Sequence, residues 1–163
     1  MDYNYVYSAN VELMLIREVS GRHNPRALLA LSLAEEEARQ SRSSVIEPEH
    51  LLVAVIRERK GLTGAIFFHA NFPASEVIDQ LRLTFKKQLP SVIAAQLPLS
   101  TAAESVLEMA SDEADQLHHN FIGVEHLLLA LSRIEGNLAA ITMTRHGLTY
   151  ELLQQELERL SAK

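Results

Sequence analysis

The sequence contains the same segment twice, 76 residues apart: Glu49-His50-Leu51-Leu52 returns as Glu125-His126-Leu127-Leu128. Aligning residues 34–57 with 110–133 without a gap gives 11 identities in 24 positions, far above chance. Self-similarity at a fixed period is typical of repeat architectures. The chain is therefore a tandem duplication, and a site in one copy should have a counterpart in the other. The identical pairs are Ala34/Ala110, Glu37/Glu113, Ala38/Ala114, Gln40/Gln116, Ile46/Ile122, Glu49/Glu125, His50/His126, Leu51/Leu127, Leu52/Leu128, Ala54/Ala130 and Arg57/Arg133.

Composition indicates an ordinary globular protein. The 163 residues are 47% hydrophobic, which is enough for one shared core or two small ones. Cysteine is absent, so disulfides, thiolate nucleophiles and cysteine metal sites are excluded. The N-terminus has no apolar signal region, and no apolar run reaches the roughly 20 residues that span a bilayer. We expect a soluble, cytoplasmic protein that does not associate with membranes.

The charge pattern argues against a nucleic-acid partner. The formal net charge is −6, and the basic residues are scattered along the chain. Binding to a phosphate backbone needs a concentrated basic surface. We therefore expect no nucleic-acid partner.

Apolar residues recur with helical spacing in both copies, which predicts four helices in each. The first pair of helices begins after Asn24 and after Ser100, because each of these residues is a good N-cap. The second pair begins near Glu47-Pro48 and Gly123-Val124. The third and fourth pairs are expected at Thr63–Ala70 with Leu138–His146, and at Ala74–Gln88 with Thr149–Ser161.

The duplication predicts an all-α fold of two four-helix repeats. A unit of about 60 residues is too small to be comfortably stable alone, so we expect the copies to pack about a pseudo-two-fold axis around one core. A short strand at Tyr3–Tyr7 and a helix at Val11–Val19 are weaker predictions. The expected organisation is an N-terminal extension at 1–23, repeat one at 24–87, a linker at 88–99 and repeat two at 100–163.

The second copy carries a long motif that resembles a known family. His119-Asn120-Phe121-Ile122-Gly123-Val124-Glu125-His126-Leu127-Leu128 is followed by Glu135-Gly136-Asn137-Leu138-Ala139-Ala140. This motif resembles the N-terminal double-repeat domain of the Clp/Hsp100 unfoldases, most closely the ClpC branch. The resemblance covers about residues 23–160 and implies an all-α protein-binding module. The first copy departs more from the pattern, with Glu47-Pro48 where Gly-Thr is usual.

The phosphate-binding loop of an ATPase is missing from the sequence. Unfoldases of this kind carry ATPase modules, but the chain has no G-x-x-x-x-G-K-[ST] segment. Met1 and the residues ahead of the repeats favour a free-standing protein. The alternative is the N-terminal substrate- or adaptor-binding piece of a longer ATP-dependent Clp unfoldase.

No catalytic or metal-binding pattern stands out. Adjacent Glu and His residues on a helix point about 100° apart, so Glu49-His50 and Glu125-His126 are not expected to chelate one ion. His50 and His126 are interpreted as structural residues that pack or bond between helices, and the His118-His119 pair as structural too. We expect no enzyme activity, no metal and no cofactor. A small-molecule enzyme is a distant alternative.

Glu49 and Glu125 are the main candidate binding residues. A structural role is open to both, because a carboxylate in the first helical turn interacts favourably with the helix dipole. The family resemblance implies a second role, in recognition of phosphoarginine marks on proteins. In that role the glutamate holds the guanidinium, and a residue at the start of the first helix helps to hold the phosphate. Motif position then pairs Glu125 with Ser100, and Glu49 with Asn24.

Three phenylalanines form a second candidate surface. Phe67, Phe68 and Phe72 cluster around the third helix of the first copy. Core packing is the favoured interpretation, but exposed rings would suit an unfolded substrate or an adaptor helix. Together these features predict a non-enzymatic module that binds Clp adaptors, Clp ATPase or protease components, or tagged or unfolded protein substrates.

Overall fold

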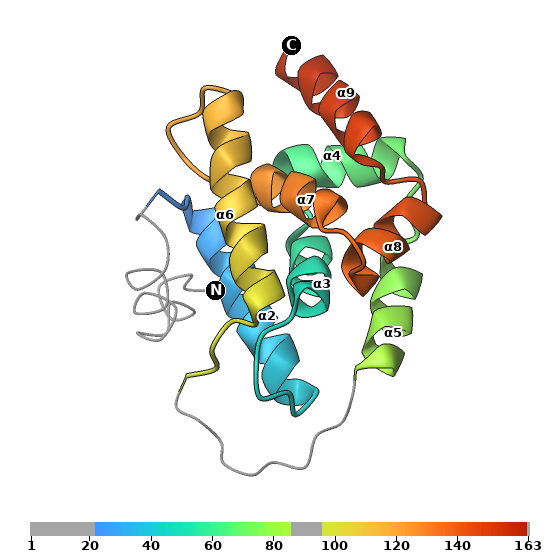
Figure 1. The fold of residues 1–163 in the computed structure, drawn as a ribbon. Coiled ribbons are helices and arrows are strands. Elements are labelled where there is room, and N and C mark those ends of the chain that lie inside the picture. Colours follow the sequence, from blue (N-terminus) through green and yellow to red (C-terminus); the bar gives the residue numbers. More distant parts are fainter. Residues whose placement is uncertain (1–21, 86–95, 163) are drawn as a thin grey trace.

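The computed structural model describes residues 22–85 and 96–162, and their regular structure is helical apart from two isolated bridges. This confirms the predicted all-α fold. Figure 1 shows the helices of the first copy in blue to green and those of the second in yellow to red. The first copy forms α2 (Pro25–Gln40), α3 (Pro48–Glu58), α4 (Gly61–His69) and α5 (Ala74–Thr84). The second forms α6 (Thr101–Gln116), α7 (Val124–Arg133), α8 (Leu138–Arg145) and α9 (Tyr150–Ser161).

The backbone contacts between the copies follow two-fold symmetry. His23 bridges to Ile122, and Leu99 bridges to Ile46. In the repeat alignment His23 corresponds to Leu99, and Ile122 corresponds to Ile46. The second bridge is therefore the first bridge with the two copies exchanged. The hydrogen bonds around these bridges obey the same exchange, since Ile122 N–H donates to Arg22 O and Ile46 N–H donates to Pro98 O, both at 2.8 Å. The predicted pseudo-two-fold relation is therefore visible in individual bonds.

One hydrophobic core serves both copies. α3 and α7 contact each other in the middle of the molecule, and the other helices surround them (Figure 1). The leucines of the repeated segment are at most 1% exposed, which confirms their predicted place in the core. Apolar side chains of all eight helices join one buried cluster. Neither copy encloses this core by itself.

Glu37 and its counterpart Glu113 are each buried in a network of charged and polar partners. Glu37 is 2% exposed and accepts hydrogen bonds from Arg57 and Arg82 at 2.9 and 2.6 Å. Its counterpart Glu113 is 1% exposed and is bound by Arg133 at 2.5 Å and by the Tyr150 hydroxyl at 3.0 Å. A buried carboxylate is stable only with such partners. The networks tie the first helix of each copy to the second and to the fourth.

The helix bounds agree with the prediction to within a few residues. α4 begins two residues earlier than expected, at Gly61, which has a left-handed φ of +59°. Glycine adopts this conformation without steric cost. The predicted strand at 3–7, the helix at 11–19 and most of the predicted linker lie outside the described residues. Leu97 and Leu99 from the end of that linker are buried, and the domain boundaries stay a prediction.

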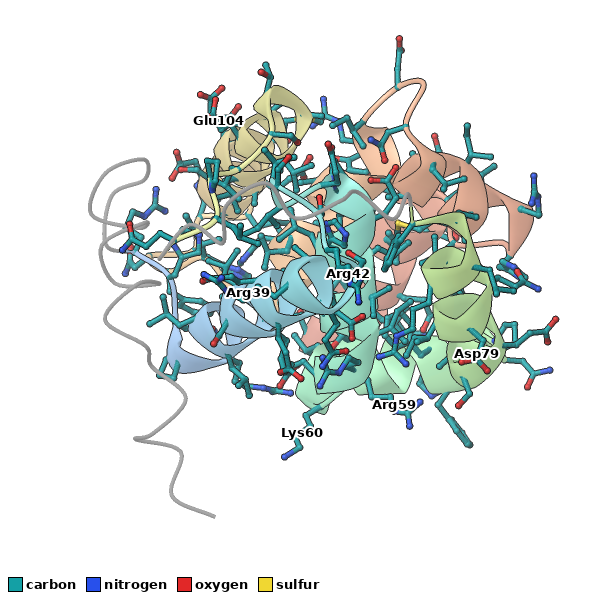
Figure 2. All side chains as sticks on the ribbon, turned by 90° about the horizontal axis from the view of Figure 1, so that it is seen from below. Arg39, Arg42, Arg59, Lys60, Asp79 and Glu104 are labelled. Atoms are coloured by element: carbon teal, nitrogen blue, oxygen red, sulfur yellow. The ribbon has the colours of Figure 1, made fainter. Side chains whose placement is uncertain are left out.

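Charged side chains of both signs are spread over the described surface. Figure 2 shows Arg59 and Lys60 at the turn between α3 and α4, Asp79 on α5 and Glu104 on α6 projecting from different sides of the bundle. None of the helices in residues 22–85 and 96–162 has the length and apolar character needed to cross a bilayer.

Candidate functional site

Glu49 and Glu125 occupy equivalent places in the first turns of α3 and α7, and the histidine beside each fixes that turn. The N–H of Glu47 donates to Nδ1 of His50 at 2.9 Å, and the N–H of Gly123 donates to Nδ1 of His126 at 2.8 Å. A side chain at this position normally closes a capping box when it is Glu or Gln. Here a histidine does so, which confirms the structural role predicted for both histidines.

The hydrogen bonds define the protonation of these histidines. Because Nδ1 accepts a backbone N–H, a neutral ring must carry its proton on Nε2. Nε2 of His50 then donates to Ser41 Oγ at 3.1 Å, and Nε2 of His126 donates to Nδ1 of His119 at 2.9 Å. Burial lowers the pKa of both histidines to about 4, and His119 and Arg22 add to the effect at His126. Both rings are therefore neutral at physiological pH.

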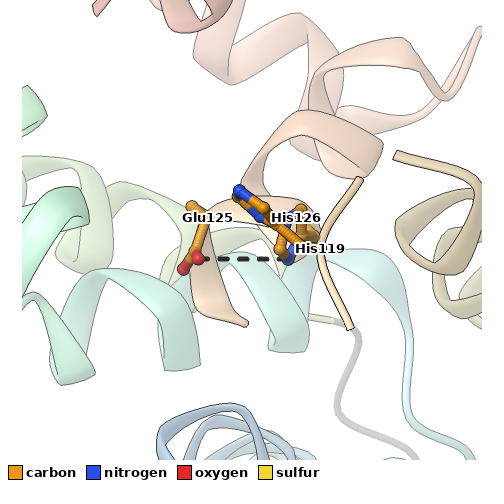
Figure 3. A group of neighbouring side chains, drawn as sticks. All are labelled: His119, Glu125 and His126. Atoms are coloured by element: carbon orange, nitrogen blue, oxygen red, sulfur yellow. Dashed lines mark hydrogen bonds and ion pairs between the residues drawn. The ribbon is translucent and has the colours of Figure 1, made fainter. Parts of the chain in front are cut away.

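The surroundings of the two glutamates differ at the residue two places ahead of each. Gly123 precedes Glu125 by two residues, and a Cβ atom on Gly123 would collide with the Glu125 carboxylate. That carboxylate is 12% exposed and lies 4.0 Å from Nδ1 of His126 (Figure 3). In the first copy Glu47 replaces the glycine. Burial raises the pKa of Glu49, and the charge of Glu47 adds to this, while hydrogen bonding from its own backbone and from the Leu138 backbone opposes it.

The pairing of each glutamate with the helix start of its own copy is wrong. α2 has 16 residues and is about 24 Å long. Asn24 lies at its beginning, whereas Ser41 at its end contacts His50, the neighbour of Glu49. Asn24 N–H instead donates to Ile122 O at 2.9 Å, just ahead of Glu125.

The counterpart contact has the same form. Ser100 N–H donates to Ile46 O at 3.0 Å, just ahead of Glu49. The structure therefore brings Asn24 to the Glu125 region and Ser100 to the Glu49 region. Each candidate site is built from both copies, because the first helix of one copy begins beside the second helix of the other.

His119, Glu125 and His126 form a compact group that sequence analysis did not foresee. One potential ligand atom from each residue lies within 4.8 Å of the others (Figure 3). The expectation that adjacent Glu and His residues diverge too far to face one ion is therefore not met here. Both nitrogens of His126 are already hydrogen-bonded, however. A metal ion would have to displace one of these bonds, so the group works better as a hydrogen-bonded support for α7.

Of the three phenylalanines predicted as a possible binding surface, two are buried and one is exposed. Phe67 and Phe72 are 5% and 8% exposed, and their rings stack on each other with centroids 5.1 Å apart. They are core residues, as the favoured interpretation predicted, and cannot form a binding surface. Phe68 is 83% exposed on α4 and remains a candidate contact.

No binding role was predicted for the other residues that lie beside the two candidate sites. Thr84 and Phe85 at the end of α5 and Leu138 at the start of α8 line a cavity next to Glu49. In the second copy Phe121 stacks on His119 with ring centroids 5.4 Å apart. His119, Phe121 and Leu138 lie in the motif segments of the second copy, but the motif did not indicate these contacts.

Comparison with known proteins gives a consistent result. The family model described as "Clp repeat (R) N-terminal domain" matches residues 22–146. The ATP-binding ClpC subunits of the ATP-dependent Clp protease from Staphylococcus epidermidis and Staphylococcus aureus (strain USA300) are 34% and 35% identical over 120 residues. These matches cover 74% of this chain and 14% of each relative, so the chain spans a small part of their length.

Solved structures share the fold at low sequence identity. The N-terminal domain of the ClpV1 ATPase from E. coli has a TM-score of 0.69 at 22% identity and covers 94% of this chain and 91% of its own. The N-terminal domain of the chaperone ClpD from Arabidopsis thaliana has a TM-score of 0.63 at 22% identity, covering 86% and 95%. At this identity the likeness concerns the fold alone.

Proposed function

The chain belongs to the Clp repeat N-terminal domain family, and from this premise we propose that it is a non-enzymatic module that binds adaptors or tagged or unfolded protein substrates of a Clp unfoldase system. The observation that carries the proposal is the Glu125 carboxylate, held in the capped first turn of α7 beside the start of α2 from the other copy. A cytoplasmic location is part of the same proposal.

The Glu125 site has charges of both signs, which suits phosphoarginine as a ligand. The carboxylate of Glu125 can take the guanidinium portion through two parallel hydrogen bonds. Arg22 lies close enough to help lower the pKa of His126, so its positive charge reaches the same region. The N-terminus of α2 adds a favourable field for an anion. Because Oδ1 of the Asn24 side chain accepts the Ala27 N–H, a bond from this side chain to phosphate would come from its NH₂ group.

Calorimetry with a phosphoarginine peptide tests this proposal. The wild-type chain should bind it, and Glu125→Ala should weaken binding at least tenfold, because the guanidinium loses its charged partner in a half-buried site. Glu108→Gln on the exposed side of α6 is the matched control and should bind normally. If the wild type gives no binding heat, the phosphoarginine proposal fails and adaptor docking has to be tested by capture of purified Clp adaptors.

A glycine substitution provides a second test that keeps the charge. Gly123→Ala should displace the Glu125 carboxylate, since the new Cβ occupies its place. The φ of −105° is open to alanine, so unfolding free energy should fall by less than about 1 kcal/mol. Phosphoarginine affinity should nevertheless fall severalfold in the same titration. Unchanged affinity would mean that the observed carboxylate position does not matter for binding.

The runner-up proposal is that the chain forms the N-terminal substrate- or adaptor-binding domain of a longer ATP-dependent Clp unfoldase. It is favoured by the 14% share of each ClpC relative that the match covers. Sequencing the transcript decides between the two proposals. A reading frame that continues into a phosphate-binding loop supports the longer protein, and a stop codon after Lys163 contradicts it.

A further inference from the structure

A cavity of about 360 Å³ lies next to Glu49 in the first copy. It is at the small end of the range for ligand pockets, and its size suits a single side chain. The walls come from the α2–α3 loop, the first turn of α3, the end of α5 and the start of α8. The lining residues are Ser41, Ser43, Glu47, Glu49, His50, Thr84, Phe85 and Leu138.

Negative charge dominates this cavity. Glu47 and Glu49 are the charged residues among its lining, and His50 is neutral because its Nδ1 accepts the Glu47 N–H. Desolvation and the charge of Glu47 both raise the pKa of Glu49, and no cationic side chain stands among the described lining residues. A cation that entered the cavity would relieve this unfavourable arrangement.

The hydroxyl groups of the cavity are set to accept hydrogen bonds. Ser41 donates its hydroxyl proton to Ala38 O, Ser43 donates to Val45 O, and Thr84 donates to Leu81 O. A hydroxyl has one proton to donate and two lone pairs. Ser41 Oγ uses one lone pair for His50 Nε2 and Ser43 Oγ uses one for Val45 N–H, so each of the three oxygens still has a lone pair to face a ligand. Together with two carboxylates, these groups favour a ligand rich in N–H donors and disfavour an anion.

An aromatic ring completes the cavity. Phe85 packs edge-on against His50 with centroids 4.6 Å apart and forms an apolar wall beside the carboxylates. A planar guanidinium combines well with this pair of features, because it binds a carboxylate through two hydrogen bonds and lies favourably against an aromatic ring. An ammonium group offers fewer donors and is more strongly hydrated.

We propose that this cavity binds the side chain of an unmodified arginine presented by a partner protein. The inference rests on the proposed protein-binding role and assigns the first copy a ligand of its own. The two copies then have different specificities: the second has Gly123 and Val124 where the first has Glu47 and Pro48. Glu47 adds a negative charge, and Pro48 removes a backbone N–H that could bind a phosphate oxygen.

The test is an NMR titration of the full chain with four peptides that differ at one position. Arginine should bind most tightly, lysine more weakly, and neutral citrulline and phosphoarginine at least tenfold more weakly at this cavity. The backbone amides of His50, Thr84 and Leu138 should shift with arginine. Glu49→Gln should weaken arginine binding at least tenfold, whereas Glu125→Gln and Glu108→Gln should leave it unchanged.

A second variant separates this inference from the proposed function. Glu47→Gly introduces the glycine that the second repeat has at this position. It should reduce the ratio of arginine affinity to phosphoarginine affinity at least threefold. Circular dichroism checks that the helix content is unchanged. Equal binding of arginine and citrulline, or arginine affinity unaffected by Glu49→Gln, overturns the inference. Phosphoarginine binding that persists in Glu49→Gln but disappears in Glu125→Ala reports on the other site and supports the proposed function alone.

Discussion

Replacing Arg133 with methionine should lower the free energy of unfolding by about 3 kcal/mol, among the largest effects expected for a single substitution in this chain. Methionine keeps most of the apolar stem but removes the guanidinium. Glu113, 1% exposed, would then keep only the Tyr150 hydroxyl as a side-chain partner. A buried carboxylate without its cation is strongly unfavourable, so the cost comes from Glu113 rather than from the lost arginine contacts.

The first copy supplies a matched comparison. Glu37 has two arginine partners, so Arg57→Met leaves Arg82 in place and should cost only about 1 kcal/mol. Urea unfolding of both variants measures the difference. Adding Glu113→Gln to Arg133→Met should recover part of the loss, because the neutral amide no longer needs a cation. Equal losses for Arg133→Met and Arg57→Met would contradict this account.

The sequence carried the information for most of the fold. Helical spacing and N-caps located the eight described helices, because periodicity and capping are local signals. The repeat alignment also contained part of the buried networks. Glu37/Glu113 and Arg57/Arg133 are identical pairs in it, and in the structure each arginine binds the glutamate of its own copy. The third partners, Arg82 and Tyr150, differ between the copies and could not be found in this way.

The candidate sites were harder to predict because they combine both copies. The family resemblance implied that Asn24 belongs with Glu49, but the length of α2 separates them by most of a 16-residue helix. Knowing the helix length could have excluded this pair. The correct partners follow from the backbone bridges between the copies, in which Ile122 contacts the start of the first copy and Ile46 contacts the start of the second. No local sequence pattern indicates this packing. Phe85 and Leu138 reach Glu49 only through the same tertiary arrangement.

Acid should begin to destabilise the protein near pH 6.5, above the pH at which ordinary carboxylates titrate. His50 and His126 have a pKa of about 4 in the folded state, against an ordinary value of about 6.5. Between these values the unfolded chain binds more protons, so stability is complete above about pH 6.5 and falls as the pH is lowered towards 4. Each histidine accounts for about 3 kcal/mol of this loss. Glu49, whose pKa is raised, offsets a part of it.

Glutamine at both positions should remove the contribution of these two histidines to the pH dependence without removing the cap. The Gln side chain can accept the same backbone N–H as in an ordinary capping box, and it does not titrate in this range. At pH 7 the His50→Gln/His126→Gln variant should therefore unfold near the urea midpoint of the wild type. At pH 4.5 its urea midpoint should be clearly higher than that of the wild type at the same pH. His118→Gln, in an exposed turn, is the control and should follow the wild type. If the double variant also follows the wild type, protonation of the capping histidines is not what destabilises the fold. Among the described histidines, the next candidate is then the buried His23, whose pKa is also lowered to about 4.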